Sequence, residues 1–540
     1  MAGRRTLVFA TAGAVAALVY FGASEFLAGV LSTASAPLLV FGQTLIPLMP
    51  TVLIKAAIAV FGTHDKLALI ITIAAVGVIV GGLIGLLGRT RRGLSLVLLA
   101  GLGVLPIVLL FTTGGTLLDF APALGGVLLG CAVYLGLLRL GAPEPALVAA
   151  APEQTHLVGV GPGGTGLSDA VPPAGAPPTD AGPDRRMFFG IAAGLSALGI
   201  AAIAAGQSAA VLARNAAGTV TRLVLPRPAS SAPPVPDGAE LDIEDLAPIV
   251  TPNAEFYRID TALVPPAVAA DSWSLRIHGM VDREVTVTME ELLGLPLEEH
   301  YVTLTCVSNE VGGDLIGNAK WLGYPIRELL ARAGPQAGAD MVLSGSDDGF
   351  TASTPLEVLT DDRAALLAVG MNGEPLPRDH GFPARLVVPG LYGFVSATKW
   401  VTSLEVTRFA DKQAYWTTRG WSTHGPVLVA SRVDVPRAGS TVAAQDGRVV
   451  TAGMAWAQHS GIEQVQVRID NGDWNTAELS EELTVDTWRQ WRFVFTGVAP
   501  GSHTVTVRAT DKDGNVQISD RRPAIPGSAT GLHDRDFRVD

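Results

Sequence analysis

The chain has 540 residues, a formal net charge of −12 and only two cysteines, Cys131 and Cys306. Its length exceeds what one compact domain usually holds, so several units are expected. The acidic balance argues against a nucleic-acid partner, because neutralising phosphates requires clustered Lys and Arg. A structural disulfide is also disfavoured, since Cys131 falls in an apolar run and Cys306 in the polar part, which leaves Cys306 free for chemistry.

The first 215 residues are dominated by Ala, Leu, Gly, Val and Ile. Five runs in this part approach the roughly 20 apolar residues that a helix needs to cross a bilayer. We therefore predict four transmembrane helices within 1–140 and a fifth within 185–206. The stretch 38–61 is also apolar, but it contains glycine, prolines and a lysine, which favours a broken segment that does not cross. The predicted spans are 6–30, 67–88, 94–112, 120–140 and 187–206.

Positive charges predict the orientation of these helices, because short cytoplasmic loops retain Lys and Arg. Arginines precede the first helix, separate the second from the third, and precede the fifth, at 4–5, 89–92 and 185–186. If 38–61 does not cross, all three clusters are cytoplasmic. We therefore expect a multi-pass protein of the cell membrane whose part after residue 206 lies outside the cytoplasm.

Two segments rich in Gly, Pro and Ala are predicted to be linkers, a disordered cytoplasmic one at 141–184 and a second at 207–249. The GVGPGGTG run in the first lacks the Lys-Ser/Thr pair of a phosphate loop, so we interpret it as linker. Arg185 and Arg186 are followed by an MFF run and a moderately apolar helix. This pattern is close to a twin-arginine export signal, here internal to the chain. The alternative is that the two arginines only anchor the fifth helix.

The rest of the chain divides into two patterned parts. Strand-like runs alternate with helical ones in 250–436, which predicts a mixed α+β domain. Short alternating strands dominate 437–540, where Asn471-Gly472 marks a hairpin turn, and we predict a small β-sandwich. The expected fold class is therefore a transmembrane helical bundle, an α+β domain and a β-sandwich.

Two segments of the α+β part carry candidate chemistry. Cys306 ends the strand-like run HYVTLTC and opens onto a polar loop, a setting that suits a metal ligand, a nucleophile or a buried thiol. His380, Arg385 and Lys399 occur within 371–400, and their cationic groups suit an anion such as phosphate. Taken singly, each of these three is as readily a solvated surface residue.

Four phrases occur together in this part: FYRID at 256–260, TLTCVSNE at 303–310, GNAKWLGYPIRELLARAG at 317–334 and MNGEPLPRDHGFPARLVVPG at 371–390. In this order they resemble the molybdopterin domain of the sulfite oxidase family, over about residues 250–540. The resemblance implies that Cys306 is the thiolate that binds molybdenum beside the pterin dithiolene, as suits a soft donor. It also implies that 437–540 form an immunoglobulin-like dimerisation domain, so a homodimer is expected.

The resemblance implies further site residues. Arg258 and Trp321 remain from the family's substrate pocket and, with Cys306, are the implied catalytic residues. Three tryptophans of the last part, Trp456, Trp474 and Trp491, are expected in the sandwich core and interface instead of at the cofactor. The residues implied around the pterin and its phosphate are Tyr257, Arg258, Ile259, Asp260, Asn309, Asp347, His380, Arg385, Ala397, Thr398 and Lys399.

The sequence departs from the family at the substrate pocket. The arginine expected five residues after the cysteine is Val311, the active-site tyrosine is Phe350, and the C-terminal arginine has no counterpart in PGSATG at 526–531. Sulfite is an anion that such arginines hold, so we expect oxygen-atom transfer on a neutral or organic small molecule and only weak sulfite oxidation. The alternatives are a reductase of methionine sulfoxide or another S-oxide and, from another class, a non-catalytic binding or sensor module.

No haem-binding site is evident in the sequence. A membrane b-haem needs two axial histidines on facing helices, whereas the apolar part holds only His64 and His156, neither in a predicted span, and no CxxCH occurs. The expected cofactor is molybdenum–molybdopterin. We expect a separate electron-transfer protein or a quinone as electron partner, and a lipid membrane around the helices.

Overall fold

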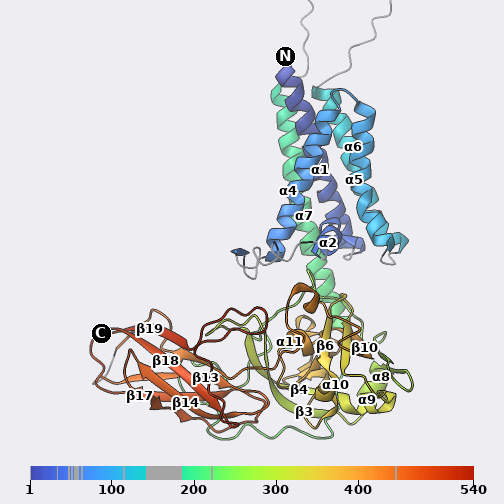
Figure 1. The fold of residues 1–540 in the computed structure, drawn as a ribbon. Helices are drawn as coiled ribbons and strands as arrows, with labels where there is room; N and C mark the ends of the chain where they lie inside the picture. Colours follow the sequence, from blue (N-terminus) through green and yellow to red (C-terminus); the bar gives the residue numbers. More distant parts are fainter. Residues whose placement is uncertain are drawn as a thin grey trace, which may run out of the picture. The chain divides into compact units, whose positions relative to one another are not determined.

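The computed structural model describes residues 2–32, 35–46, 49, 53, 60–61, 65–112, 116–141, 185–220, 223–443 and 447–540. The chain splits into two compact units, Met1–Ala216 and Ala217–Asp540. The first unit is helical and the second is rich in β-sheet (Figure 1). Each unit is described by itself below.

The helical unit is built around its first helix, against which other helices pack closely. Its helices are α1 (Ala2–Leu31), α2 (Pro37–Leu45), α4 (Asp65–Leu87), α5 (Arg92–Thr112), α6 (Leu117–Gly141) and α7 (Arg185–Val220). Glycines allow the close approach, because a Cβ at Gly13 of α1 would lie 2.8 Å from the Cα atom of Gly85 in α4. A Cβ at Gly22 of α1 would lie 2.8 Å from the Cα of Gly199 in α7. Such contacts between small residues are typical of helices that associate in lipid.

The five apolar helices predicted from the sequence are confirmed as helices. Each is long and apolar enough to cross a bilayer. The candidate membrane spans are Arg5–Leu31, Lys66–Leu87, Arg92–Phe111, Leu117–Gly141 and Arg186–Ala210. α2 has nine residues, too few to cross, while most of the rest of 38–61 lies outside the described residues. The linker 142–184, His64 and His156 also lie outside them.

The α+β part of the second unit contains two sheets that share one hydrophobic core, as the alternating sequence pattern predicts. The first sheet has the strand order β2-β1-β10-β5-β6, and the second has β3-β4-β7-β8, with β9 paired to β7. Leu275 and Leu404 of the first sheet and Leu322 and Leu367 of the second belong to this core. The strands are β1 (Ser274–Gly279), β2 (Val285–Thr288), β3 (Glu298–Thr305), β4 (Ile316–Pro325), β5 (Met341–Ser346), β6 (Thr351–Pro355), β7 (Leu366–Met371), β8 (Glu374–Pro375), β9 (Arg385–Val387) and β10 (Val401–Thr407). The helices are α8 (Met289–Gly294), α9 (Ile326–Ala333), α10 (Leu356–Thr360) and α11 (Gly393–Ser396).

The C-terminal part is a sandwich of two sheets around a core that contains Trp491. One sheet has the order β11-β13-β17-β16 and the other β12-β19-β18-β14-β15. The predicted hairpin is confirmed, since β14 and β15 pair antiparallel on either side of Asn471-Gly472. β11 pairs with β13 although it precedes Pro436, so the sandwich begins before the predicted boundary at 436. The strands are β11 (Ala430–Val435), β12 (Thr441–Val442), β13 (Val449–Trp456), β14 (Ile462–Ile469), β15 (Asn475–Thr476), β16 (Glu478–Leu479), β17 (Arg489–Phe495), β18 (Gly501–Asp511) and β19 (His533–Val539).

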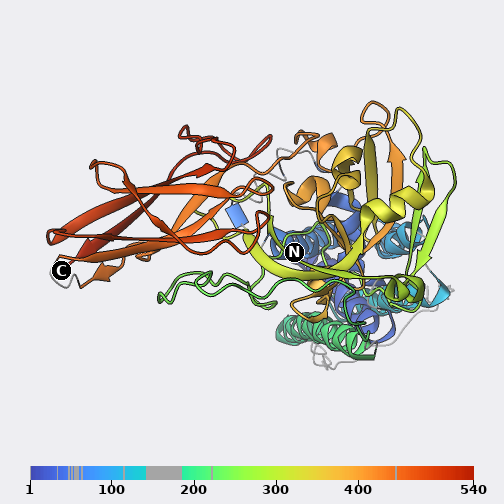
Figure 2. The same ribbon diagram turned by 90° about the horizontal axis from the view of Figure 1, so that it is seen from below.

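The predicted linker 207–249 is ordered wherever it is described. Helix α7 continues to Val220. The irregular segment 223–249 runs beside both parts of the second unit (Figure 2) and is hydrogen bonded to both. Ala229 N donates to Leu297 O, and Glu481 N donates to Gly238 O. A small core that includes Ile316, Trp456 and Trp488 also joins strand β4 to the sandwich. The composition of 223–249 is that of a linker, and only these tertiary contacts fix it.

Candidate active site

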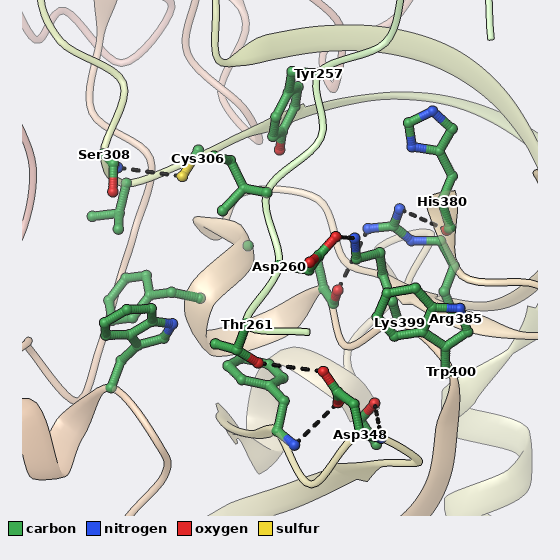
Figure 3. Close-up of a pocket in the computed structure, with 18 of the residues that line it drawn as sticks. Tyr257, Asp260, Thr261, Cys306, Ser308, Asp348, His380, Arg385, Lys399 and Trp400 are labelled. Carbon is green, nitrogen blue, oxygen red and sulfur yellow. Dashed lines mark hydrogen bonds and ion pairs between the residues drawn. The ribbon is translucent and has the colours of Figure 1, made fainter. Parts of the chain in front are cut away.

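A pocket of about 110 Å³ opens in the α+β part, where the ends of several strands and loops meet (Figure 3). In the figure, Cys306 and Ser308 lie on one side of the pocket, and Arg385, Lys399 and Trp400 lie on the other. Its lining comes from the segments 256–261, 306–308, 346–350, 380–385, 393–400 and 416–421. These segments include most of the site residues that the sequence predicts.

Cys306 directly follows β3 and is held by the loop that comes after it. Its backbone N donates to Leu315 O at 2.9 Å, and its carbonyl accepts from Asn309 N at 3.0 Å. Asn309 closes the same loop, because its side-chain oxygen accepts from Leu315 N at 2.9 Å. Burial raises the pKa of the Cys306 thiol. A soft metal would replace that proton, so the position suits a thiolate ligand.

Arg385, at the start of β9, is a buried cation whose bonding partners are all carbonyl oxygens. Its guanidinium donates to His380 O at 3.1 Å, Leu386 O at 3.3 Å and Ala397 O at 3.4 Å. Within the described part of the chain no carboxylate pairs with it, and burial lowers its pKa to about 10. A buried charge without a counter-charge is costly, so this guanidinium calls for an anionic ligand.

Lys399 lies beside Arg385 and shares a carboxylate with Arg258. Its ammonium contacts Asp260 at 2.8 Å, and burial lowers its pKa to about 8 against the raising effect of Asp260. Arg258 contacts the same carboxylate at 3.0 Å and Asp379 at 3.4 Å, but its side chain is 38% exposed and is not part of the pocket lining. We call Asp260, His380, Arg385 and Lys399 the cation side.

His380 contributes a neutral imidazole to the cation side. Its Nε2 lies 3.1 Å from the carbonyl oxygen of Asn253, so this nitrogen carries the proton. Burial first, and then the nearby Arg385, lower its pKa to about 4. At neutral pH the ring therefore adds no charge, and its other nitrogen is an acceptor.

Eight predicted site residues line the pocket: Tyr257, Ile259, Asp260, Cys306, His380, Arg385, Ala397 and Lys399. Five do not: Arg258, Asn309, Trp321, Asp347 and Thr398. Asp347 lies between two lining residues, and the buried Thr398 hydroxyl is 2.7 Å from that of Ser344. Trp321 is fully buried, donates its indole N–H to Val302 O at 3.0 Å and lies under Arg385, with the guanidinium 5.1 Å from the ring centre. This position favours a supporting role for Trp321 instead of the predicted contact with substrate.

The pocket lining also contains four aromatic residues that the sequence did not indicate as a group: Phe350, Phe394, Trp416 and Trp421. They form a connected wall, because the ring centres of Phe394 and Trp421 are 5.8 Å apart and those of Trp416 and Trp421 are 6.0 Å apart. Tyr415 joins Phe350 to the same wall, at 5.8 Å from Phe350 and 5.1 Å from Trp416. We call these four residues the aromatic side. Their segments are far apart in the sequence and share no pattern.

Val311 and the PGSATG loop at 526–531 lie together beside the loop that follows Cys306. Both line a second pocket of about 30 Å³, and a Cβ at Gly531 would be 3.5 Å from Val311 Cγ2. The lining of this pocket in the described structure includes Glu310 but neither Arg nor Lys. The two positions at which the sequence lacks the expected arginines therefore converge on uncharged side chains and one carboxylate.

Residues 262–416 match the family described as oxidoreductase molybdopterin binding domain. The chain is 30% identical to mitochondrial sulfite oxidase of Homo sapiens over 340 residues, which covers 54% of this chain and 60% of that protein. The uncharacterized oxidoreductase YuiH of Bacillus subtilis is 30% identical over 180 residues, covering 33% of this chain and 87% of that protein. The structure of the sulfane dehydrogenase SoxCD from Paracoccus pantotrophus has a TM-score of 0.46 and 22% identity, over 54% of this chain and 84% of that one. The chain thus spans about 60% of the length of the mitochondrial relative.

Proposed function

Because the chain belongs to the sulfite oxidase family of molybdopterin oxidoreductases, we propose that it is a molybdenum-dependent enzyme that transfers an oxygen atom to or from a neutral organic substrate. The observation that carries the proposal is the buried Arg385, whose partners in the described structure are all carbonyl oxygens. When bound, the cofactor supplies a metal centre that exchanges two electrons and one oxygen atom.

The residues of the pocket fit this cofactor. Cys306 would bind the metal through Sγ, on the opposite side of the pocket from the cations. Arg385 and Lys399 would hold the pterin phosphate, which supplies the anion that Arg385 lacks. His380 would accept a hydrogen bond from an N–H group of the pterin, and not from the phosphate, through the nitrogen that does not face Asn253. Because burial keeps these groups out of water, each bond to the phosphate is stronger than at the surface.

The substrate is proposed to be neutral because the lining of the second pocket, in the part of the chain that the structure describes, contains neither Arg nor Lys. Where the family holds sulfite with arginines, this chain has Val311 and the loop 526–531, and Glu310 beside them would repel an anion. The aromatic side offers apolar surface for an organic group. A thioether or the corresponding sulfoxide combines an apolar body with a sulfur that gains or loses one oxygen. We therefore propose this class of substrate.

The setting of the enzyme is proposed from the helical unit. Its five long apolar helices would anchor the chain in the cell membrane, with the second unit on the extracytoplasmic side. Electrons would pass to or from a separate electron-transfer protein or a quinone. The sandwich would be immunoglobulin-like and would mediate a homodimer.

Export of the second unit is proposed to use Arg185 and Arg186 as an internal twin-arginine signal, because a domain folded around its cofactor cannot be threaded. Replacing both by lysine keeps the positive charge, so membrane anchoring should persist while the second unit stays in the cytoplasm. Protease accessibility on intact cells and inverted vesicles measures this. Unchanged exposure outside the cell in the double-lysine variant would contradict the export proposal alone.

The central experiment uses the full chain, purified in detergent and analysed for molybdenum and pterin. A dye-linked assay then measures thioether oxidation and, with a reduced dye, sulfoxide reduction, with sulfite as the comparison substrate. We expect stoichiometric cofactor and turnover of the neutral substrates, with a much higher KM for sulfite. Absence of molybdenum from fully assembled protein would overturn the enzyme proposal and favour a binding module. Efficient turnover of micromolar sulfite would overturn the substrate class.

A further inference from the structure

Strand β3, which carries Cys306 at its end, is the edge strand of its sheet. It pairs with β4 along one side, whereas on the other side its first residue, Glu298, forms only an isolated bridge with Ser230. Exposed strand edges are usually covered in native proteins. Towards Cys306 the cover comes from two loops of the sandwich. Thr303 N donates to Asp486 O at 2.9 Å, and Trp488 N donates to Thr303 Oγ1 at 2.9 Å. The C-terminal part is therefore hydrogen bonded to β3 at Thr303, three residues before Cys306.

Gln458 makes the contact that lies nearest to Cys306. Its side chain is 5% exposed, and its Nε2 donates to Thr303 O at 2.9 Å and approaches Thr305 Oγ1 at 3.4 Å. Thr305 directly precedes Cys306 in the chain. The amide of one sandwich residue thus contacts the backbone of Thr303 and the side chain of Thr305, just before the chain enters the pocket at Cys306.

The other end of the Gln458 amide makes no hydrogen bond. Its Oε1 is buried without a partner in the described structure. An unbonded carbonyl oxygen in the interior destabilises the fold, so stability alone does not explain a glutamine at this position. The hydrogen bonds of this amide are those that its Nε2 donates to β3.

We propose that Gln458 is a positioning residue, which sets the direction in which the Cys306 thiol enters the pocket. On one side, the backbone N of Cys306 donates to Leu315 O in the loop that follows. On the other side, Gln458 binds Thr303, three residues before Cys306. The sandwich is then a part of the metal site as well as a separate domain. The inference rests on the proposed function only in taking Cys306 as the metal ligand.

The test replaces Gln458 by methionine, which keeps the length of the side chain but removes both donors. The matched control is Thr451→Val, which also removes a buried side-chain donor of the sandwich, but one that donates to Phe493 O at 3.0 Å between two sandwich strands. In cofactor-loaded protein, we expect Q458M to keep its molybdenum, to shift the electron paramagnetic resonance spectrum of the Mo(V) state, and to lower kcat about 10-fold with little change in KM. Thr451→Val should leave the spectrum unchanged.

A second readout needs no cofactor. In cofactor-free protein carrying Cys131→Ala, Cys306 is the only thiol, and its alkylation rate reports how firmly it is held. We expect faster alkylation in Q458M than in Thr451→Val. If Q458M does not fold, Thr305→Val removes one acceptor of the same contact and takes its place. A wild-type spectrum and a wild-type alkylation rate in the variant would overturn the positioning role. If purified wild-type protein contains no molybdenum, the proposed function is overturned, but the alkylation rates still test whether Gln458 positions Cys306.

Discussion

The two sides of the pocket differ in chemistry and in how they are built. The cation side consists of charged and polar groups held by hydrogen bonds and an ion pair, the shortest being the 2.8 Å contact between Lys399 and Asp260. The aromatic side consists of four uncharged rings, which are connected by ring contacts directly or through Tyr415. The difference teaches that one pocket can combine groups suited to a phosphate-bearing cofactor with a wall of different chemistry, which can change independently of them. Changes on the two sides should therefore have separable effects, and Cys306 should link them.

The largest effect is expected from Cys306→Ser, because we propose that this thiol binds the metal at which the substrate reacts. A hydroxyl is a hard donor and replaces a soft thiolate poorly on molybdenum. The variant should fold and retain pterin, while turnover in the dye-linked assay falls to background. Circular dichroism and pterin analysis provide the control for folding. Activity near that of the wild type would refute the ligand assignment.

The next effect is loss of cofactor from variants of the cation side. Arg385→Ala or Lys399→Ala removes a charge-assisted bond to the phosphate, worth about 1.5–3 kcal/mol, which corresponds to about 10- to 100-fold weaker retention. Molybdenum and pterin content per protein measures it. Arg327→Ala is the matched control, since Arg327 also donates to a carbonyl oxygen, that of Arg363 at 3.2 Å, but lies outside the pocket. Full occupancy in both cation-side variants would show that these residues are structural.

The cation side could be predicted from the sequence because its residues occur in long contiguous phrases. Asp260 belongs to FYRID, and His380 and Arg385 belong to one phrase of the segment 371–390. The aromatic side could not be predicted, because its members come from a turn, a short helix and an irregular segment that only the tertiary fold brings together. Trp321 shows the limit of resemblance, since a matching motif gave its position in the chain but not the direction of its ring.

The fold follows the same division between local and tertiary information. Apolar length alone predicts the five long helices, because each is a continuous stretch of sequence. The segment 223–249 has the composition of a linker, yet bonds such as that from the Trp488 indole to Ile249 O at 2.8 Å fix it. β11 was assigned to the wrong part because Pro436 after it suggested a boundary, whereas its pairing with β13 is a contact between distant residues.

A smaller and more selective effect is expected on the aromatic side. Trp421→Ala should leave molybdenum and pterin content unchanged but lower kcat/KM for a neutral sulfur substrate about 10-fold, as aromatic contacts of about 0.5–1.5 kcal/mol and buried area are lost. Sulfite turnover, which we expect to be weak in the wild type, should change little. A parallel loss of cofactor would show that the two sides are not separable.

The smallest effect is a pH dependence of stability that arises where the sandwich meets the pocket-bearing part. His459 Nδ1 lies 2.8 Å from Asp486 Oδ1, and this contact is the first cause that raises the pKa of His459 above its usual value. Arg363 and Asp361 also face the ring, the first lowering and the second raising that pKa. Since the pKa is higher in the folded state, the pair contributes its full stability below the unfolded value of about 6.5 and loses it as pH rises through the folded value. The His459 side chain is 41% exposed, so solvent screening limits the contribution to less than about 1 kcal/mol.

Chemical unfolding between pH 5 and 9 should therefore show that wild type is slightly more stable than His459→Gln at low pH and that the difference vanishes at high pH. A difference that grows with pH would contradict the ion pair. Because Asp486 O also accepts from Thr303 N, the same titration in cofactor-loaded protein tests whether loosening this loop is felt at Cys306.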